Sequence, residues 1–563
     1  MYLQLKNNII QSLKNRIEEL NYPTIEDIRL DEPPKPEMGD LSSNVSFQLA
    51  KELKRSPMEI TQEILENLET PQYINKIESK GPYINYYINY TQYSTQLLEH
   101  ITTNYGELNT EEKEEIILEH TSANPNGPLH IGHLRNAIIG DSLARVLRKA
   151  GHNVETQYYV NDMGRQIAMV VWGIENLEMP IDGKEKKKDH QIGELYHQVY
   201  LKTQDENTNT TQEIDTLIKT YENKSTPLDQ EFEHAINTCL DGMKETLTRL
   251  GITHNKFTWE GQFVRNGQVN KIVDTLEESG NTIFDEVLRL NLEPYGIDKA
   301  LVLRRSDGTS LYSTRDLAYH QYKAENSTVS IDILGSDHQL AVEQISIALE
   351  IIGSQRPEVI LYEFIDLPEG SMSTRRGVFI SVDQLMDEAE QRAREEIQKR
   401  RNDLKPEEID EIAEIIGIGA IRYFIAKISP EKKITFKWEE VLNFERGCAA
   451  IQYAHARAYQ LLQKAPKTTT INDTEWTPSS EEIELIRTLS RFPEIIQESS
   501  KTRRIHNIAQ YAQDLANSFN KFYKATPVIG SPHENLRLNL VEKSKITIAN
   551  CLDVLGIQSP NYM

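Results

Sequence analysis

Apolar positions recur at helical spacing over the first part of the chain and then switch to a strand-like pattern. The segments NNIIQSLKNRIEEL, NVSFQLAKELK and MEITQEILENL place apolar residues three and four apart, as amphipathic helices do. The run GPYINYYINY is rich in aromatic and β-branched residues, which is typical of a strand. Residues 1–105 are therefore predicted to form a small α/β domain.

The pattern changes again near residue 115, where strands and helices begin to alternate. The run EIILEH is followed by a loop, by the helical run HLRNAIIGDSLARVLRKAG with Gly151 as its expected cap, and by the strand-like run VETQYYV. Further strand-like runs are ALVLRR, STVSIDILGSD and EVILYEFID. This alternation predicts a Rossmann-like, doubly wound parallel sheet, here over residues 106–425.

Residues from about 173 to 300 differ from the rest of this domain, because they are polar and mostly helical in pattern. They are interpreted as an insertion into the parallel-sheet domain. The lysine-rich run KEKKKDH within them is interpreted as a solvated loop.

Beyond about residue 410 the spacing is almost entirely helical, as in FERGCAAIQYAHARAYQLLQ and IAQYAQDLANSFNKFY. Residues 426–563 are therefore predicted to form an all-α bundle. The expected fold class is a multidomain α/β protein. It combines a parallel-sheet domain and its insertion with a small N-terminal α/β domain and a C-terminal helical bundle.

Composition narrows the class of protein. The 563 residues include 62 basic and 86 acidic ones, and the net charge of -24 argues against general coating of nucleic acid but allows a local basic groove. Cys239, Cys448 and Cys551 form no CxxC pair, so neither disulfides nor a structural zinc is expected. With no signal-like start and no apolar run of about 20 residues, the chain is expected to be soluble and cytoplasmic.

The stretch SANPNGPLHIGH carries the most specific chemistry. His130 and His133 lie three apart where a helix is expected to begin, so both rings are predicted to face the same way beside unpaired backbone N–H groups. Gly132 leaves room for a flat ring against the backbone. This arrangement suits a nucleotide whose phosphates lie across the two imidazoles.

Other interpretations of the two histidines are weaker. Composition alone would produce HxGH about 0.02 times in such a chain, so chance is a poor explanation. A zinc site would need further ligands, and neither HExxH nor CxxC occurs. The phosphate-binding patterns GxxxxGK[ST] and GxGxxG are also absent from the sequence.

In its strand–loop–helix context, HIGH resembles the signature of class I aminoacyl-tRNA synthetases. EHTSANPNGPLHIGHLRNAIIGDSLARVL followed by YYVNDMGRQI is similar to arginyl-tRNA synthetases in particular. GDLSSNVSFQLAK and GPYINYYIN resemble that family's N-terminal domain, and GSMSTRRGVFISVDQL falls where its KMSKS loop belongs. IRYFIAKISPEKKITFKWEE and NIAQYAQDLANSFNKFYKATPVI resemble its C-terminal anticodon-binding bundle.

The resemblance implies an arginine site. A guanidinium needs carboxylates and planar acceptors in a fixed fork, and Tyr312 and Asp316 stand four apart on one expected helical face. Asp316 could instead form a surface pair with Arg315 or Lys323. The positions that match the family's arginine-binding residues are Glu119, Ser122, Asn124, Tyr312, Asp316 and Gln339.

The resemblance also implies that Gly335, Asp337 and His338, after an apolar strand, line the ATP site with the HIGH residues, although a plain turn would explain them too. In the KMSKS position the chain has Ser371-Met372-Ser373-Thr374-Arg375, without either lysine. Some family members compensate with a lysine just upstream of HIGH, but Gly127 occupies that place here. Met372 and Ser373 are expected at the ATP, and Arg375 and Arg376 at the pyrophosphate.

Contacts with RNA are expected at two places. Tyr83 and Asn85 match the positions at which the family's N-terminal domain touches the tRNA elbow. In QYAHARAYQ, Tyr453 and Arg457 suit base stacking and phosphate contact. Either tyrosine could instead be an ordinary packed residue.

Together these features predict ATP-dependent ligation of L-arginine to tRNA(Arg) through an arginyl-adenylate, with Mg·ATP as substrate and no tightly bound cofactor. The resemblance implies that tRNA must bind before arginine is activated. A monomer is expected, with no membrane partner. Two other classes stay open: a nucleotidyltransferase that uses HxGH on a small phosphate substrate, and a non-catalytic RNA-binding relative of the synthetases.

Overall fold

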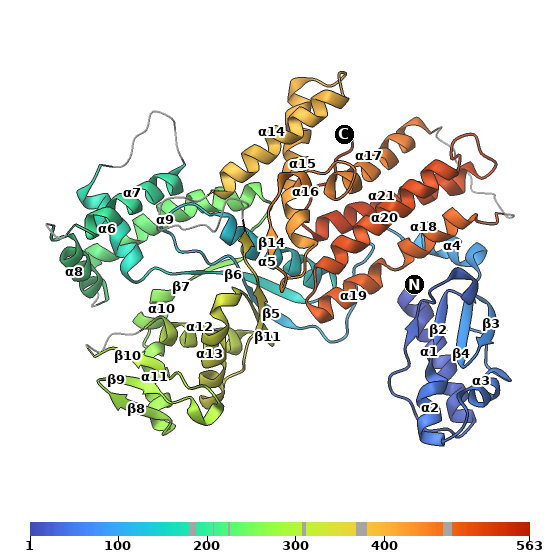
Figure 1. Ribbon diagram of the computed structural model, residues 1–563, viewed down its shortest axis with the longest axis horizontal. Helices are drawn as coiled ribbons and strands as arrows, with labels where there is room; N and C mark the ends of the chain where they lie inside the picture. Colours follow the sequence, from blue (N-terminus) through green and yellow to red (C-terminus); the bar gives the residue numbers. More distant parts are fainter. Residues whose placement is uncertain (179–186, 206–207, 223–225, 307–310, 367–379, 466–475) are drawn as a thin grey trace.

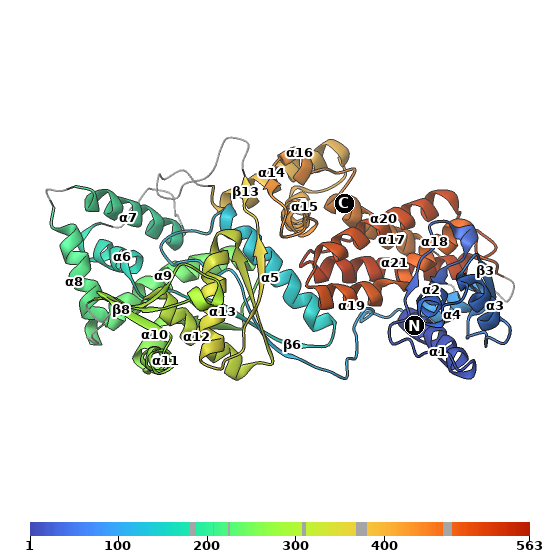
Figure 2. The same cartoon turned by 60° about the horizontal axis from the view of Figure 1, so that its bottom comes forward.

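The computed structural model describes residues 1–178, 187–205, 208–222, 226–306, 311–366, 380–465 and 476–563. In Figures 1 and 2 the N-terminal domain (blue) lies beside the helical bundle (orange to red), at the end of the molecule opposite to helices α6–α8. Helix α5 (Ile131–Lys149) lies between these two ends. Among the described residues, no helix is both long and apolar enough to cross a membrane.

The N-terminal domain packs helices against one antiparallel sheet of order β1-β2-β4-β3. The apolar faces of its helices, with Ile9 and Leu13 for example, are buried in the same hydrophobic cluster as Ile84 and Tyr86 of the sheet. The helices are α1 (Tyr2–Glu19), α2 (Val45–Leu53), α3 (Pro57–Leu65) and α4 (Tyr90–His100), and the strands are β1 (Leu30–Asp31), β2 (Leu41–Ser43), β3 (Ile74–Lys80) and β4 (Tyr83–Ile88). The predicted α/β character of this segment is confirmed.

The central sheet is parallel throughout, in the order β12-β11-β5-β6-β7. Because β6 and β11 lie on opposite sides of β5, the chain reverses its direction of winding there, and a crevice opens at the carboxyl ends of these strands. The strands are β5 (Glu115–Glu119), β6 (Asn153–Val160), β7 (Lys256–Trp259), β11 (Val329–Gly335) and β12 (Glu358–Tyr362). Helices α12 (Tyr312–Asn326) and α13 (Gln339–Ile351) flank β11 in the sequence.

The expected insertion over about 173–300 is not one continuous excursion, because β7 lies within it and is an edge strand of the central sheet. The four residues KFTW carry too little pattern to reveal a strand, and pairing with β6 makes them one. Before β7 lie α6 (Arg165–Asn176), α7 (Lys188–Thr203), α8 (Thr210–Glu222) and α9 (Thr226–Arg249).

After β7 the chain forms two short helices and a separate antiparallel sheet of order β10-β9-β8. The predicted strand ALVLRR belongs to this small sheet and not to the central one. The elements are α10 (Glu260–Arg265), α11 (Gln268–Glu278), β8 (Thr282–Asp285), β9 (Val287–Leu290) and β10 (Leu301–Arg304).

Over residues 380–465 and 476–563, the C-terminal part is helical, as predicted, apart from one short strand. β14 (Ile434–Thr435) lies beyond the predicted domain limit at 425/426 and pairs in parallel with β13 (Ile365–Asp366) of the sheet domain. The helices are α14 (Val382–Arg400), α15 (Pro406–Ala426), α16 (Trp438–Val441), α17 (Cys448–Lys464), α18 (Ser480–Ser490), α19 (Phe492–Thr502), α20 (His506–Ala525) and α21 (Glu534–Val554).

Ion pairs connect the three parts. Arg422 of α15 pairs with Asp141 of α5 across 2.5 Å, with both side chains buried. Arg487 of α18 reaches Asp40 of the N-terminal domain, also at 2.5 Å. The bundle therefore contacts both the sheet domain and the N-terminal domain. The three cysteines are buried and unpaired.

Candidate active site

The two signature histidines stack on each other at the start of α5. His130 is the N-cap of the helix and His133 lies in its first turn, with ring centroids 3.8 Å apart and ring planes inclined by 27°. His133 Nδ1 accepts from the backbone N–H of His130, and His130 Nδ1 accepts from that of Gly132 at 3.1 Å. The rings themselves thus satisfy two of the backbone donors that a helix start leaves unpaired.

These hydrogen bonds assign the protonation of both rings. Burial lowers the pKa of His130 to about 4, and burial together with the neighbouring His130 lowers that of His133 to about 3, so both are neutral near pH 7. Since each Nδ1 accepts a backbone N–H, each ring carries its proton on Nε2 and can donate from it. The rings therefore act as oriented neutral donors.

Gly132 was expected to leave room for a flat ring against the backbone. The ring that occupies this room is the imidazole of His130. A Cβ at this position would lie 2.8 Å from His130 Cε1 and 2.9 Å from its Nδ1. The imidazole of His130 folds back over the glycine, which no larger residue allows without moving the ring.

A cavity of about 620 Å³ opens at the carboxyl ends of β5, β6 and β11. Its walls contain acidic groups and also apolar residues, such as Val359 and Tyr362. Of the residues expected from the sequence it brings together Glu119, Ser122, Asn124, His133, Tyr312, Asp316, Gly335 and His338.

The loop after β5 is held in an uncommon conformation. Thr121 and Ser122 have φ angles of +70° and +39°, although neither is glycine. Asn136 of α5 supports the loop, because its side chain accepts from the N–H of Thr121 at 2.5 Å and donates to the carbonyl of Ile333 at 2.7 Å. Backbone strain kept in this way is typical of functional sites.

Glu119 ends β5 as predicted and is fixed on both carboxylate oxygens. Ser122 donates to one at 3.0 Å, and the ammonium of Lys323 donates to the other at 2.8 Å. Lys323 is fully buried on α12 and also bonds the buried Asp332 of β11. A buried cation therefore pairs with two of the acidic residues that line the cavity.

Tyr312 and Asp316 share one face of α12, as predicted from their spacing. Burial, with the nearby Glu119 carboxylate, raises the pKa of Asp316 to about 7. Lys323, one of the two partners considered for a surface pair with Asp316, pairs with Glu119 and Asp332 instead, and Arg315 is buried and pairs with Glu260. The hydroxyl of Tyr312 lies against Gly164, where a Cβ would approach it to 2.6 Å.

A second cavity, of about 650 Å³, lies between the HIGH segment and helices α6 and α7. His133, Asn124 and Gln166 line both cavities, and the amide of Asn124 donates to Gln166 at 2.7 Å. Residues that line only the second cavity include His130, Arg165 and His197. The helix start that carries the histidines therefore faces two neighbouring spaces.

Only some of the expected ATP-site residues after β11 line the first cavity. Gly335 and His338 line the first cavity, and Asp337 lies beside His338 with a 3.8 Å contact between their side chains. Gln339 does not line this cavity; it is exposed at the start of α13 and donates to Glu343 at 3.3 Å. Its expected contact with arginine stays a prediction.

Met372, Ser373, Arg375 and Arg376 lie outside the described residues. Their expected roles at the ATP and the pyrophosphate stay predictions.

The expected RNA contacts also differ in accessibility. Tyr83 is 45% exposed on β4, and Tyr453 of α17 is equally exposed, so neither is an ordinary core residue. Arg457 lies over the Tyr453 ring at 4.6 Å. Asn85, by contrast, is 2% exposed, although it lies only two residues from Tyr83 on the same strand, and its expected contact with RNA stays a prediction.

Sequence reasoning missed several residues of the site. Lys323, Asp332, Gln166 and Glu260 line or support the cavity, and burial raises the pKa of Glu260 to about 8. Helical spacing could have revealed Lys323, which follows Asp316 by seven residues and so faces the same way. Asp332 and Glu260 carry no comparable local signal.

A parallel sheet of this order, with HIGH at the start of the helix after its central strand, defines the catalytic domain of class I aminoacyl-tRNA synthetases. The family model for the class I (R) tRNA synthetase catalytic domain matches residues 94–438. An arginyl-tRNA synthetase N-terminal domain matches residues 4–88, and a DALR anticodon-binding domain matches residues 451–563. The chain belongs to the arginyl-tRNA synthetase family.

Individual relatives agree over their full lengths. The chain is 55% identical to an arginine–tRNA ligase of Methanothermobacter thermautotrophicus and 53% identical to one of Methanosphaera stadtmanae, covering 100% of both chains in each case. The solved arginyl-tRNA synthetase of Thermus thermophilus is 28% identical and superimposes with a TM-score of 0.83 over 98% of this chain and 99% of that one. The predicted family and fold class are confirmed.

Proposed function

We propose that the protein ligates L-arginine to tRNA(Arg) in two steps at the first cavity. The observation that carries the proposal is the joining of an acidic pocket, formed by Glu119 and Asp316, to His133 in one cavity, with His130 on the neighbouring cavity that His133 also lines. A cationic amino acid and the phosphates of a nucleotide can therefore meet there. Mg·ATP enters as a substrate.

In the first step, a carboxylate oxygen of arginine bonds to the α-phosphorus of ATP, and the bond to the pyrophosphate breaks. No side-chain nucleophile is required, so the protein contributes positioning and charge stabilisation. His130 and His133 donate from Nε2 to phosphate oxygens as negative charge develops on them. Arg375 and Arg376 are proposed to neutralise the leaving pyrophosphate in place of the missing lysines.

In the second step, the terminal ribose hydroxyl of the tRNA attacks the carbonyl carbon of arginyl-adenylate, and AMP leaves. Tyr83, Tyr453 and Arg457 are proposed to contact the tRNA, since all three are accessible or half-buried. The domain limits at 105/106 and 425/426, a monomeric state and a cytoplasmic location belong to the same proposal.

Specificity for arginine is proposed to come from the ionised form of Asp316 beside Tyr312. A guanidinium can give two parallel hydrogen bonds to one carboxylate, which an ammonium cannot match in geometry. The resident ammonium of Lys323 also disfavours a second ammonium close by. Lysine is therefore expected to be a poor substrate.

The test is ATP–pyrophosphate exchange with arginine, lysine or glutamine, each with and without tRNA. Exchange with arginine is expected, and His130→Asn or His133→Asn should lower it by about 10²–10³-fold. His152→Asn, which removes a histidine that contacts Glu114 away from the cavity, is the control and should leave the rate unchanged.

The rival functions give different results in the same assay. A non-catalytic RNA-binding protein would show no exchange under any condition. A nucleotidyltransferase would turn over ATP with a small phosphate substrate and would not depend on arginine. Exchange driven by lysine or glutamine instead would refute the proposed specificity.

A further inference from the structure

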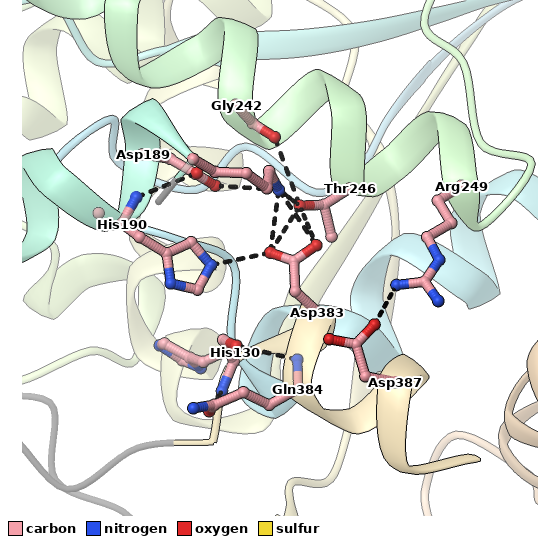
Figure 3. Close-up of polar contacts among 12 residues, drawn as sticks. His130, Asp189, His190, Gly242, Thr246, Arg249, Asp383, Gln384 and Asp387 are labelled. Carbon is pink, nitrogen blue, oxygen red and sulfur yellow. Dashed lines mark hydrogen bonds and ion pairs between the residues drawn. The ribbon is translucent and has the colours of Figure 1, made fainter. Parts of the chain in front are cut away.

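Three side chains from the insertion contact the carboxylate of Asp383, which lies in the first turn of α14 (Figure 3). The ammonium of Lys187 lies 2.9 Å from it, and His190 Nε2 also lies 2.9 Å from it. The hydroxyl of Thr246, on α9, donates to it at 3.0 Å. Burial opposes ionisation of Asp383, but the bonds from His190 and Lys187 outweigh it and lower its pKa to about 2.

Asp189 completes this cluster and is its most enclosed member. Its side chain is fully buried, and the Lys187 ammonium lies 3.6 Å from it. Gly242 of α9 makes room for it, because a Cβ there would lie 2.5 Å from Asp189 Oδ1. Lys187 belongs to the lysine-rich run that was expected to be a solvated loop, yet its ammonium lies between two carboxylates.

The ligating atoms of Asp189, His190 and Asp383 lie within 4.8 Å of one another, a spacing that could hold a metal ion. The Lys187 ammonium already lies close to both carboxylates. A divalent ion in the same place would face an added positive charge at short range. The charges on the described residues therefore favour the lysine as the cation of this cluster.

The same turn of α14 is attached to the HIGH segment through the backbone. Val382 donates its N–H to the carbonyl of Leu129 at 2.8 Å, and Ser381 forms an isolated β-bridge with His130. Ser381 also caps α14, since its hydroxyl accepts from the N–H of Gln384 at 3.1 Å. The start of α14 thus binds the HIGH segment on one side and the insertion helices on the other.

We propose that Asp383 is a positioning residue for amino-acid activation, with Lys187 as its cationic partner. The cluster attaches the first turn of α14 to α7 and α9. This turn in turn fixes the position of the backbone at Leu129 and His130. The two histidines are proposed to donate hydrogen bonds to the phosphates. A shift of this backbone therefore weakens the binding of ATP more than the binding of arginine. The inference rests on the proposed function.

A second ion pair joins the same two helices one turn away and supplies a matched control. Arg249 at the end of α9 pairs with Asp387 of α14 at 2.5 Å, and Asp387 is largely exposed (Figure 3). This pair joins α9 to α14 without contacting the residues that bridge to His130. Arg249 also pairs with Glu390 of α14 at 2.8 Å. Asp387→Asn therefore removes one of the surface contacts between these helices, and its effect can be compared with that of the buried cluster.

The experiment compares Asp383→Asn, Lys187→Met and Asp387→Asn in the full chain by ATP–pyrophosphate exchange. Asp383→Asn and Lys187→Met are expected to raise the KM for ATP by about tenfold while the KM for arginine stays within about twofold. Asp387→Asn should change neither. The reciprocal exchange Lys187→Asp with Asp383→Lys should recover part of the loss, because it restores opposite charges at the same positions.

Hydrogen exchange of the amides at residues 129–134 gives a readout that needs no catalysis. It should become faster in Asp383→Asn than in Asp387→Asn. Equal effects of these two variants, or an equal rise in both KM values, would overturn the inference. So would saturable binding of Zn²⁺ or Mn²⁺ that Asp383→Asn abolishes. If the wild-type chain catalyses no exchange, the proposed function fails, and hydrogen exchange still decides the positioning role.

Discussion

The ammonium of Lys323 donates to the carboxylate of Glu119 across 2.8 Å, in a position from which solvent is excluded. The two residues are 204 positions apart in the chain, on α12 and at the end of β5. The same ammonium bonds Asp332. The proposed arginine pocket therefore has part of its negative charge compensated before any substrate arrives, and Asp316 is left as the acid whose ionisation can respond to a guanidinium.

Lys323→Met should destabilise the sheet domain strongly. It leaves the buried Asp332 carboxylate without its cation, and breaking a buried pair on one side costs about 3–5 kcal/mol. Lys399→Met is the control, because Lys399 is 67% exposed and pairs with Glu396 on a helix surface, where such pairs contribute at most about 1 kcal/mol. Urea unfolding followed by tryptophan fluorescence measures both. Similar losses in the two variants would contradict the proposed importance of the buried pair.

Arginine binding should weaken as the pH falls through about 7. Burial and the Glu119 carboxylate raise the pKa of Asp316 to about 7, so the acid is ionised above this value and protonated below it. Only the ionised form attracts the guanidinium, and the KM for arginine should rise up to about tenfold per pH unit below 7. Asp316→Asn should have a high KM with little dependence on pH. A wild-type KM that is constant between about pH 6 and about pH 8 would refute this assignment.

Gly132→Ala should impair the use of ATP by displacing the His130 ring. The added Cβ would lie 2.8 Å from His130 Cε1, so the ring must turn away from its stacked place. A loss of up to about 10²-fold in kcat/KM for ATP is expected. The double-mutant cycle with His130→Ala tests the cause, since Gly132→Ala should cost nothing further once the ring is absent. Additive losses would point to another role for the glycine.

Arg457→Gln should weaken tRNA binding without changing the KM for ATP. The guanidinium lies over the rings of Tyr453 and Tyr523, at 4.6 and 4.8 Å, on the face where tRNA contact is proposed. The slope of log Kd against log salt should fall by about one. Arg400→Gln is the control, because Arg400, at the end of α14, makes a similar contact with the ring of Phe444. An unchanged salt slope would exclude a phosphate contact by Arg457.

Most of the fold could be predicted because its elements carry their own pattern. Strand β5, helix α5 and strand β6 are local runs with clear periodicity, and Gly151 ends α5 with a φ of +98°, as its expected capping role requires. The short strands β7 and β14 were missed, since a few residues become strands only when a partner strand lies beside them. For the same reason, β7 lies within the expected insertion, and β14 lies beyond the expected limit of the sheet domain.

The sequence by itself determined the family, the place of His130 and His133 at a helix start, and the shared face of Tyr312 and Asp316. Each of these depends on spacing over a few residues, which local geometry converts directly into position. The tertiary structure decided that Asn85 is buried, that Gln339 lies outside the cavity, and that Lys323 and Lys187 each meet carboxylates distant in the chain. Burial and ion pairing depend on which distant segments pack together, and no local pattern records that packing.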